Sequence, residues 1–551
     1  MTSIKFSDDD HKRVLDEIEK NKLARMEEET KRNQKIAEAL KTFEPLSRRI
    51  NFTEDTNGKQ QQQEEPLDLA DELIKKFKFK TVKTSEQIYR YDSQKGVYLN
   101  DGEILIKSEL EARYVKEKEE FNKSMILLSQ SDRGNGLVLP QPWSKKKIDE
   151  IIGQIERRTY IDITELDGDI EWLACADCML NLKTGETAPF DPKYLNTTQI
   201  PVKYNLTVRN YIADLWYYCA QDPIVNSCPC PAVMKFLDEV MAPEDVEILL
   251  DFMAYCLWRY YKFHNWLLLN GAGQNGKSTL LKLIARFFGQ QNVSSTSLRG
   301  LLYGKFASAG LYQKLVNIDA DLSGDILQNT GELKKLTGSD EITAEFKYGQ
   351  PFKFRNYAKP IFSCNEIPET TDKTDAFLRR LIIVNFKQQF FGNKEDPNLI
   401  DKLTNEEELS GLLYELLRRL PGVLEKGIRQ TTDETMSQTY EKYVRGSNPV
   451  KYFAETALTT GDEIIPKPEL YNNSYCWFCK VNKLAPESEQ SFNRKLKAEG
   501  YQYKLFRMEN GSREYCWYGI KLVDWKVLED KEQETLEDLT ALSPLEREAM
   551  K

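Results

Sequence analysis

The sequence predicts an α/β fold with a P-loop core and a mostly parallel sheet, preceded by a mixed α+β region and followed by a separate compact unit. Two observations support the core. The stretch WLLLNGAGQNGKSTLLKLIARFFG, which begins at Trp266, contains an apolar strand, a glycine-rich loop and an amphipathic helix in succession. Further apolar strands then alternate with helices to about residue 387, which is typical of a parallel sheet.

Composition and length indicate a soluble protein of several domains. The chain has 551 residues, of which 40% are hydrophobic and 30% charged, and domain sizes of ~100 to 200 residues predict three or four units. No apolar run approaches the roughly 20 residues that span a bilayer, and the polar start does not resemble a signal peptide. We therefore expect no membrane partner and an intracellular, cytoplasmic location.

Charge and residue usage limit the chemistry. With a formal net charge of −10, any nucleic-acid site must be a local cluster of lysine and arginine. The only histidines are His11 and His264, so histidine-based metal sites and general bases are excluded as the main chemistry. The ten cysteines are predicted to be reduced thiols, because a four-thiolate zinc site would need two pairs that are distant in sequence to meet.

The pattern along the chain predicts seven segments. Residues 1–66 combine a highly charged helix, over about 8–43, with a polar linker over 53–66 that cannot bury enough apolar surface to fold. The other six segments are an α+β domain (67–206), a helical segment (207–262), the P-loop core (263–395), a helical lid or connector (396–446), a carboxy-terminal unit (447–527) and an acidic tail (528–551).

The sequence DGD at 167–169, within the α+β domain, is predicted to be a surface turn.

The sequence GAGQNGKST fits the pattern G-x-x-x-x-G-K-[ST] and predicts a nucleotide site that uses ATP and Mg²⁺. Glycines let backbone amides curl around phosphate oxygens, Lys277 is expected to reach the β and γ phosphates, and Ser278 is expected to ligate Mg²⁺. The predicted nucleotide-binding residues are Gly271, Ala272, Gly273, Gln274, Asn275, Gly276, Lys277, Ser278 and Thr279.

Three later strands supply the remaining catalytic candidates. The apolar run 315–318 ends in Asp319 and Asp321, either of which is a candidate to support Mg²⁺. The strand in KPIFSCNEIP ends in Asn365, which is placed to orient the attacking water. Arg379 and Arg380 precede a further apolar strand, where an arginine can stabilise charge on the transferred phosphoryl group.

The order of these motifs resembles the superfamily 3 DNA helicases, specifically the ATPase part of the poxvirus-type and phage or plasmid primase-helicases. The diagnostic segment is LKKLTGSDEITAEFKYGQPFKF, residues 333–354. The resemblance implies an AAA+-like ATPase core and a hexameric ring that moves 3′ to 5′. It also implies that Arg380, or else Arg379, reaches the ATP of the neighbouring subunit.

In that family, this segment leads into a hairpin that projects into the central pore. The resemblance implies that Lys334 and Asp340 mark the segment and that Lys347 and Tyr348 contact single-stranded DNA. The residues themselves agree, since FKYGQPFKF alternates aromatic and cationic side chains around a turn. The three phenylalanines, Phe346, Phe352 and Phe354, are expected to be packing residues, and Lys353 can equally be a solvated charge on an edge strand.

Residues 447–527 resemble the carboxy-terminal winged helix of the same family. A recognition helix is expected over Ser488–Ala498, and the Asn510-Gly511 pair predicts a hairpin that forms the wing. Three cations on the helix, Arg494, Lys495 and Lys497, are candidate contacts to duplex DNA phosphates. A winged helix can also bind another protein, and that alternative stays open.

The sequence therefore favours an ATP-dependent replicative DNA helicase of a virus, plasmid or other mobile element. Its expected partners are single-stranded and forked DNA, further copies of the chain in a hexamer, and a primase or polymerase. Two alternatives stay open. One is a nucleotide-switched origin initiator without processive unwinding, and the other is a fused primase-helicase, which would need a polymerase site within residues 67–160.

Overall fold

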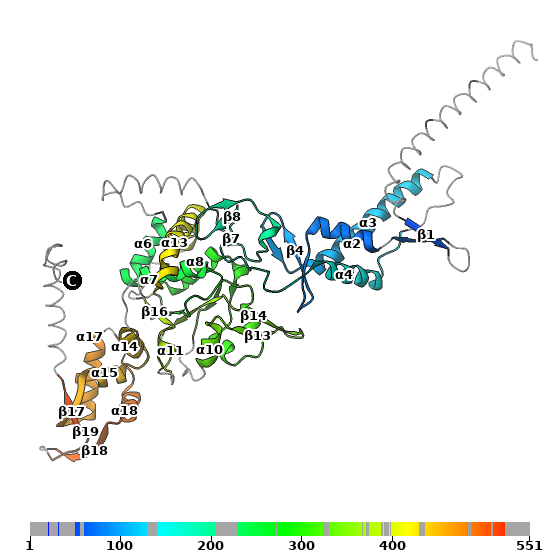
Figure 1. The fold of residues 1–551 in the computed structure, drawn as a ribbon. Helices are drawn as coiled ribbons and strands as arrows, with labels where there is room; N and C mark the ends of the chain where they lie inside the picture. Colours follow the sequence, from blue (N-terminus) through cyan, green and yellow to red (C-terminus); the bar gives the residue numbers. More distant parts are fainter. Residues whose placement is uncertain are drawn as a thin grey trace, which may run out of the picture. The chain divides into compact units, whose positions relative to one another are not determined.

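The computed structural model places most of the chain from residue 50 to residue 523 (Figure 1). It describes residues 50–54, 60–64, 66–128, 140–204, 229–271, 273–322, 330–365, 367–370, 374–386, 398–428, 436–482, 486–508 and 511–523, with single residues at 20, 31, 390, 396 and 484. Nearly all of the predicted amino-terminal helix, the stretch 205–228 and the acidic tail 528–551 lie outside the described residues.

The chain forms two compact units. The first consists of Met1–Ser93 with Tyr98–Glu165, and the second of Gln94–Val97 with Leu166–Lys551. The predicted amino-terminal domain, 67–206, therefore does not match a single unit, because residues 166–204 are part of the same unit as the P-loop.

The first unit packs helices against a four-stranded sheet. Its helices are α2 (Pro66–Phe77), α3 (Gly102–Leu128) and α4 (Lys145–Thr159). The strands, in spatial order, are β5 (Val97–Leu99), β4 (Gln87–Asp92), β3 (Lys80–Val82) and β6 (Tyr160–Ile161). Leu73, Ile106 and Ile155 are fully buried between these elements. Strands β1 (Ile50–Glu54) and β2 (Gln60–Glu64) pair antiparallel, in a stretch that overlaps the predicted linker 53–66.

The predicted surface turn at 167–169 is wrong in one respect. Asp167 has a positive φ of 56°, as a turn residue can, but its side chain is buried. Its carboxylate accepts a hydrogen bond of 2.6 Å from the fully buried guanidinium of Arg259 and one of 3.0 Å from the hydroxyl of Tyr357. The turn thus fixes the small sheet of β7 (Trp172–Ala174), β8 (Met179–Asn181) and β9 (Thr187–Ala188) to the body of the second unit.

A five-stranded parallel sheet is the centre of the second unit, which confirms the predicted mostly parallel sheet. In spatial order its strands are β11 (Val293–Ser294), β12 (Val316–Asp319), β15 (Lys359–Cys364), β10 (Trp266–Asn270) and β16 (Leu381–Asn385). Asn270 pairs with Cys364 on one side and Asn385 on the other. The residues that follow these strands therefore meet at one edge of the sheet.

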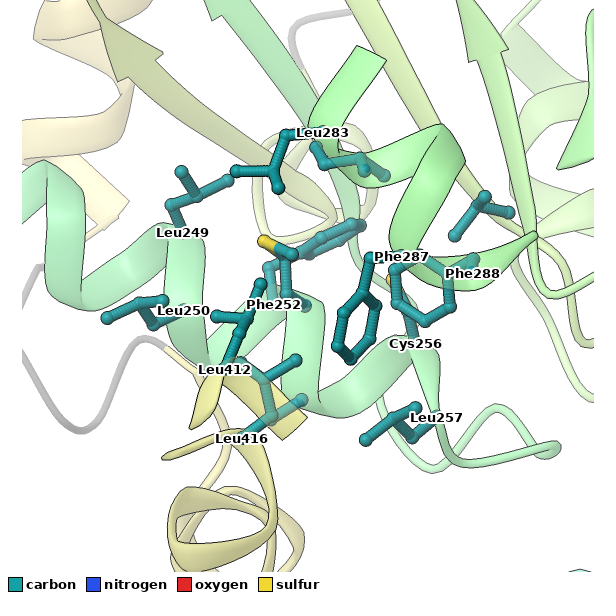
Figure 2. Close-up of a cluster of buried hydrophobic side chains, with 14 of the residues drawn as sticks. Leu249, Leu250, Phe252, Cys256, Leu257, Leu283, Phe287, Phe288, Leu412 and Leu416 are labelled. Atoms are coloured by element: carbon teal, nitrogen blue, oxygen red, sulfur yellow. The ribbon is translucent and has the colours of Figure 1, made fainter. Parts of the chain in front are cut away.

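Helices bury the sheet around one large apolar core. Helices α6 (Pro231–Val240) and α7 (Pro243–Cys256) precede the P-loop, α8 (Lys277–Phe288) follows it, and α13 (Glu406–Lys426) comes after the sheet. Figure 2 shows Phe252 of α7 together with Phe287 of α8 and Leu412 of α13, and all three are fully buried. The helical character predicted for 207–262 and 396–446 is thus found where the structure describes these segments.

The carboxy-terminal part has a core of its own, in which Phe453, Tyr475, Phe492 and Trp517 are fully buried. Its three-stranded antiparallel sheet has the order β17 (Leu458–Pro466), β19 (Arg513–Leu522), β18 (Gln502–Arg507). The helices are α14 (Met436–Ser447), α15 (Pro449–Ala457), α16 (Lys467–Glu469), a π-helical turn (Leu470–Tyr475), α17 (Cys476–Val481) and α18 (Glu489–Ala498). The winged-helix assignment stays a prediction.

Two features are absent from the described residues. No helix among them is long and apolar enough to cross a bilayer. Nor do they contain a group of three or more His, Cys, Asp or Glu side chains that could hold a metal ion.

A lysine is buried at the start of β15, at the end of the strand opposite to Asn365. The Lys359 ammonium group donates to the carbonyl oxygens of Trp258 and Tyr260, the latter at 3.3 Å. It lies 4.6 Å from the ring centroid of Tyr255 and 5.1 Å from that of Tyr261. Burial lowers the pKa of Lys359 to about 7.

This buried lysine predicts a pH-dependent stability. Between pH 7 and about pH 10 the unfolded chain binds more protons at this position than the folded chain, so stability rises with pH across that window. Relative to Lys359→Met, we expect the wild type to gain on the order of a few kcal/mol over the window. Thermal melting of both proteins between pH 7 and about pH 10 tests this, and a difference between them that does not vary with pH would contradict it.

Candidate functional site

The P-loop connects β10 to α8 and needs glycine at two positions. Gly276 has a φ of 92°, and a Cβ there would lie 3.0 Å from Cγ1 of Val240. A Cβ on Gly271 would collide with the side chain of Asn275. The loop therefore brings its backbone close to its neighbours and presents amide groups at the start of α8, where a helix favours an anion. Ala272 lies outside the described residues.

Lys277 joins the P-loop to the neighbouring strand. Its ammonium group donates to the carbonyl oxygen of Gly271 and, over 3.3 Å, to Oδ1 of Asn365, which follows β15. Burial lowers the pKa of Lys277, and the neighbouring Cys364 opposes that shift. The predicted lysine and the predicted water-orienting asparagine are thus together at the same edge of the sheet.

The structure separates the two candidate aspartates. Asp319 accepts a hydrogen bond of 2.9 Å from the backbone amide of Leu298, at the start of α9 (Leu298–Tyr303), and so ties down that helix. Asp321 lines the cavity that contains the P-loop. The backbone amide of Leu322 donates to the carbonyl oxygen of Ser363 over 2.8 Å, which holds this segment beside β15. Of the two aspartates, Asp321 is therefore the one that lines the cavity, and which of them supports Mg²⁺ stays a prediction.

A cavity of about 1110 Å³ surrounds the P-loop, large enough for a nucleotide. One wall comes from the apolar side chains of α6, and another from α12 (Leu399–Leu403) with Phe390. The wall formed by α6 was not predicted from the sequence, although the apolar face of this helix was a usable signal. The wall residues are Phe236, Val240, Phe390, Leu399 and Leu403, and the polar residues beside them are Lys235, Glu239, Asp396 and Lys402.

A buried carboxylate fixes the position of α6. Glu408, on α13, accepts hydrogen bonds from the backbone amides of Ala232 at 3.1 Å and Val233 at 3.0 Å, at the amino-terminal end of α6. Gly411 lies one turn further along α13, and a Cβ there would collide with the carbonyl group of Pro229. The helical connector thus positions the helix that forms the apolar wall of the cavity.

The two arginines differ in exposure. Arg380, the first candidate to reach a neighbouring subunit, is 9% exposed, and its guanidinium group donates to the carbonyl oxygen of Ala376 over 2.5 Å. It also lies 3.3 Å from Nδ1 of His264, whose pKa is lowered by burial and then by the nearby Arg380 and Arg379. Arg379 is exposed. Arg379 is therefore the more exposed of the two candidates, and which of them reaches a neighbouring subunit stays a prediction.

The predicted hairpin is present. Strands β13 (Glu341–Glu345) and β14 (Pro351–Arg355) pair antiparallel, and Figure 1 shows the hairpin projecting from the unit. Tyr348 is 93% exposed at the tip with a φ of 69°, and Lys347 lies 5.2 Å from its ring centroid. Phe352 and Phe354 are buried as expected, whereas Phe346 is 47% exposed and stacks on Phe352.

The base of the hairpin connects directly to the nucleotide edge. Only residues 356–358 separate β14 from β15, and β15 leads to Asn365. The buried Asn356 side chain donates to the carbonyl oxygen of Leu336 over 2.7 Å, and this residue ends α10 (Thr330–Leu336). Lys334 on α10 donates to the hydroxyl of Thr374 over 3.2 Å, beside the helix α11 (Asp375–Leu378) that precedes the arginines. Lys334 thus links α10 to the residue that directly precedes α11.

Of the three cations predicted on the carboxy-terminal helix, two are exposed. Helix α18 begins after Ser488, whose hydroxyl accepts from the backbone amide of Ser491. Arg494 and Lys497 are exposed, whereas Lys495 forms ion pairs with Glu369 at 2.7 Å and Glu487 at 2.8 Å. Two carboxylates already neutralise Lys495, so it is a poor phosphate contact. In the predicted wing, Asn510 lies outside the described residues.

The fold and the cavity define an α/β protein with a P-loop core. Residues 139–242 match the family model described as "D5 N terminal like", and residues 269–380 match a "family of unknown function (DUF5906)". The chain thus contains a region similar to the D5 N terminal family and, over its P-loop, a DUF5906 region.

Curated proteins and solved structures include relatives that are similar to the chain. The "Putative helicase L207/L206" of Acanthamoeba polyphaga mimivirus is 28% identical over 176 residues, which are 30% of this chain and 18% of the relative. The chain thus matches less than a fifth of that protein's length. Two apo structures of the NrS-1 C terminal region are each 13% identical, with a TM-score of 0.34, and each match covers 83% of this chain and 100% of that chain.

The different environments of the two aspartates predict different effects of mutation. Asp321→Asn should raise the Mg²⁺ concentration needed for half-maximal nucleotide hydrolysis by at least about 10-fold, because it removes a charged oxygen ligand. In Asp319→Asn the new amide oxygen can still accept from Leu298, so this matched variant should stay within a few-fold of wild type. Phosphate release across a Mg²⁺ titration checks both, and a larger effect at Asp319 would contradict the assignment.

Proposed function

We propose that the chain is an ATP-dependent DNA helicase that assembles as a homohexamer and moves along single-stranded DNA. The observation that carries this proposal is the short connection between two sites. The contact between Lys277 and Asn365 lies at one end of β15, and the hairpin with Lys347 and Tyr348 at its tip leads into the other end. A change at the nucleotide edge can therefore reach the hairpin through a single strand.

The P-loop residues fit a nucleoside triphosphate with Mg²⁺. Backbone amides at the start of α8 and the ammonium group of Lys277 would hold the phosphates, and Phe236 with Leu399 would cover the base. Ser278 and Asp321 line the same cavity and offer oxygen ligands, which Mg²⁺ prefers. When bound, the ion would neutralise charge on the phosphates.

Hydrolysis would use residues of two subunits. Asn365 would orient the attacking water, since it lies beside Lys277 at the sheet edge. The exposed Arg379 would stabilise the charge on the phosphoryl group bound to the next subunit, while Arg380 holds its position from inside. Because α11 contacts α10 through Lys334 and Thr374, a shift of Arg379 can also move the base of the hairpin.

The exposed hairpin tip would contact the DNA. Lys347 supplies a positive charge and Tyr348 an aromatic face, which together suit a phosphate and a base of one strand. Forked DNA, and a primase or polymerase that acts with the helicase, would be further partners. A replicative role in a virus, plasmid or other mobile element fits this activity.

The experiment is ATP hydrolysis with and without single-stranded DNA, combined with a mass measurement in solution. We expect a species of about six chains whose hydrolysis is stimulated by DNA. Lys347→Ala should lower DNA-stimulated hydrolysis and fork unwinding by at least about 10-fold and leave basal hydrolysis intact, because Lys347 does not line the P-loop cavity. The control is Lys353→Ala, which removes an exposed cation from a strand of the same hairpin.

Three outcomes would change this proposal. If forks are not unwound while origin-type duplex binding responds to nucleotide, the chain is an initiator. If labelled nucleotides are built into primers, residues 67–160 contain a polymerase site and the chain is a primase-helicase. If Lys347→Ala and Lys353→Ala lose DNA-stimulated hydrolysis and fork unwinding equally, the hairpin tip has no special role in contacting DNA.

A further inference from the structure

The ribbon formed by β18 and β19 carries different side chains on its two faces. Antiparallel pairing sets Tyr503 opposite Trp517, Leu505 opposite Tyr515, and Arg507 opposite Arg513. Residues directly opposite each other share a face of the sheet, so these three pairs form one face. We call it the Tyr515 face, made of Tyr503, Leu505, Arg507, Arg513, Tyr515 and Trp517.

Exposure increases along this face. Trp517 is fully buried in the carboxy-terminal core, whereas its neighbour along the face, Tyr515, is 56% exposed and Leu505 is 48% exposed. The ring of Tyr503 contacts both aromatic residues, with centroids 5.1 Å from Trp517 and 6.0 Å from Tyr515. Packing accounts for the buried tryptophan. It does not account for a large aromatic ring that is more than half in water.

Four cations surround these rings. The ammonium group of Lys467 lies 3.1 Å from the ring centroid of Tyr503 and 5.8 Å from that of Tyr515, and the ammonium group of Lys497 on α18 lies 5.7 Å from that of Tyr503. Figure 1 shows α18 beside the ribbon. Arg507 and Arg513 are exposed at the outer end of the face.

The two arginines form a cross-strand pair of like charge. Such a pair destabilises a sheet, and neither guanidinium group forms an ion pair with a residue that the structure describes. The strands place their carboxylate, Glu514, on the opposite face, where it pairs with Phe506. The charge of the Tyr515 face therefore suits an anion that comes from outside the chain.

We propose that the Tyr515 face binds single-stranded DNA, with a base stacked on Tyr515 and phosphates held by Arg507 and Arg513. Exposed aromatic rings beside cations are what single strands require, because unpaired bases offer their faces for stacking. A duplex keeps its bases stacked inside the helix, so it would contact only the arginines of this face and not the ring of Tyr515. The site is separate from the β13–β14 hairpin, and it rests on the proposed function only in taking DNA as the substrate.

The test is fluorescence anisotropy with the full-length protein, without nucleotide, in a Lys347→Ala background that removes the hairpin contact. The probes are a labelled oligothymidylate and a duplex of equal length. Tyr515→Ala should weaken binding of the single strand by at least about 10-fold, while Tyr515→Phe, which keeps the ring, should retain it. Arg507→Ala should reduce the salt dependence of binding by about one phosphate contact.

The matched control is Lys504→Ala, which removes a cation from the same ribbon but from the opposite face. It should leave the affinity for the single strand unchanged. Tyr515 is more than half exposed, so its replacement leaves the core around Trp517 in place, and a thermal melt can check this.

Three results would overturn the proposal. The first is an affinity of Tyr515→Ala that equals that of Lys504→Ala. The second is an equal loss for the duplex, which would make the face a duplex contact. The third is unchanged DNA binding by Tyr515→Ala together with a smaller mass in solution, which would make the Tyr515 face an interface between subunits. Since nucleotide is absent throughout, failure here is distinguishable from failure of the proposed ATP-driven activity.

Discussion

The parallel direction of all five central strands is the constraint on which the candidate site depends. It brings the segments after β10, β12 and β15 to one edge, although they are up to about a hundred residues apart in the chain. There Lys277 reaches Asn365, and Asp321 lines the same cavity. A change of one strand's direction would move its polar residue to the opposite edge and dismantle the site.

The sheet edge brings Lys277 and Asn365 together, but much of the cavity wall comes from outside the sheet. Helix α6 provides an apolar wall, and Glu408 of α13 holds its first turn through two backbone amides. The buried pair of Asp167 and Arg259 joins the preceding segment to the same body. The D5 N terminal like region, which ends at residue 242, therefore contributes directly to the cavity.

Local patterns were enough to predict the P-loop and the parallel strands, because each is encoded by neighbouring residues, whereas the hairpin was predicted from the family resemblance with which its local pattern agrees. What sequence could not give depends on tertiary partners. Asp167 was correctly placed in a turn, but its burial requires Arg259, which is distant in sequence. The same holds for Arg380, which turns inward to His264, and for Lys495, which pairs with Glu369. In each case the sequence identified a charged side chain, but it could not show which tertiary partner that side chain would contact.

In the proposed function, the arginine of one subunit completes the nucleotide site of the next. The most direct measurement is ATP hydrolysis by a mixture of Lys277→Ala and Arg379→Ala subunits, each of which should be inactive alone. In a mixed ring, an intact P-loop can meet an intact Arg379 from its neighbour, so we predict that mixing restores hydrolysis. If the mixture stays as inactive as its components, although mass measurement shows mixed oligomers, Arg379 does not act across a subunit boundary.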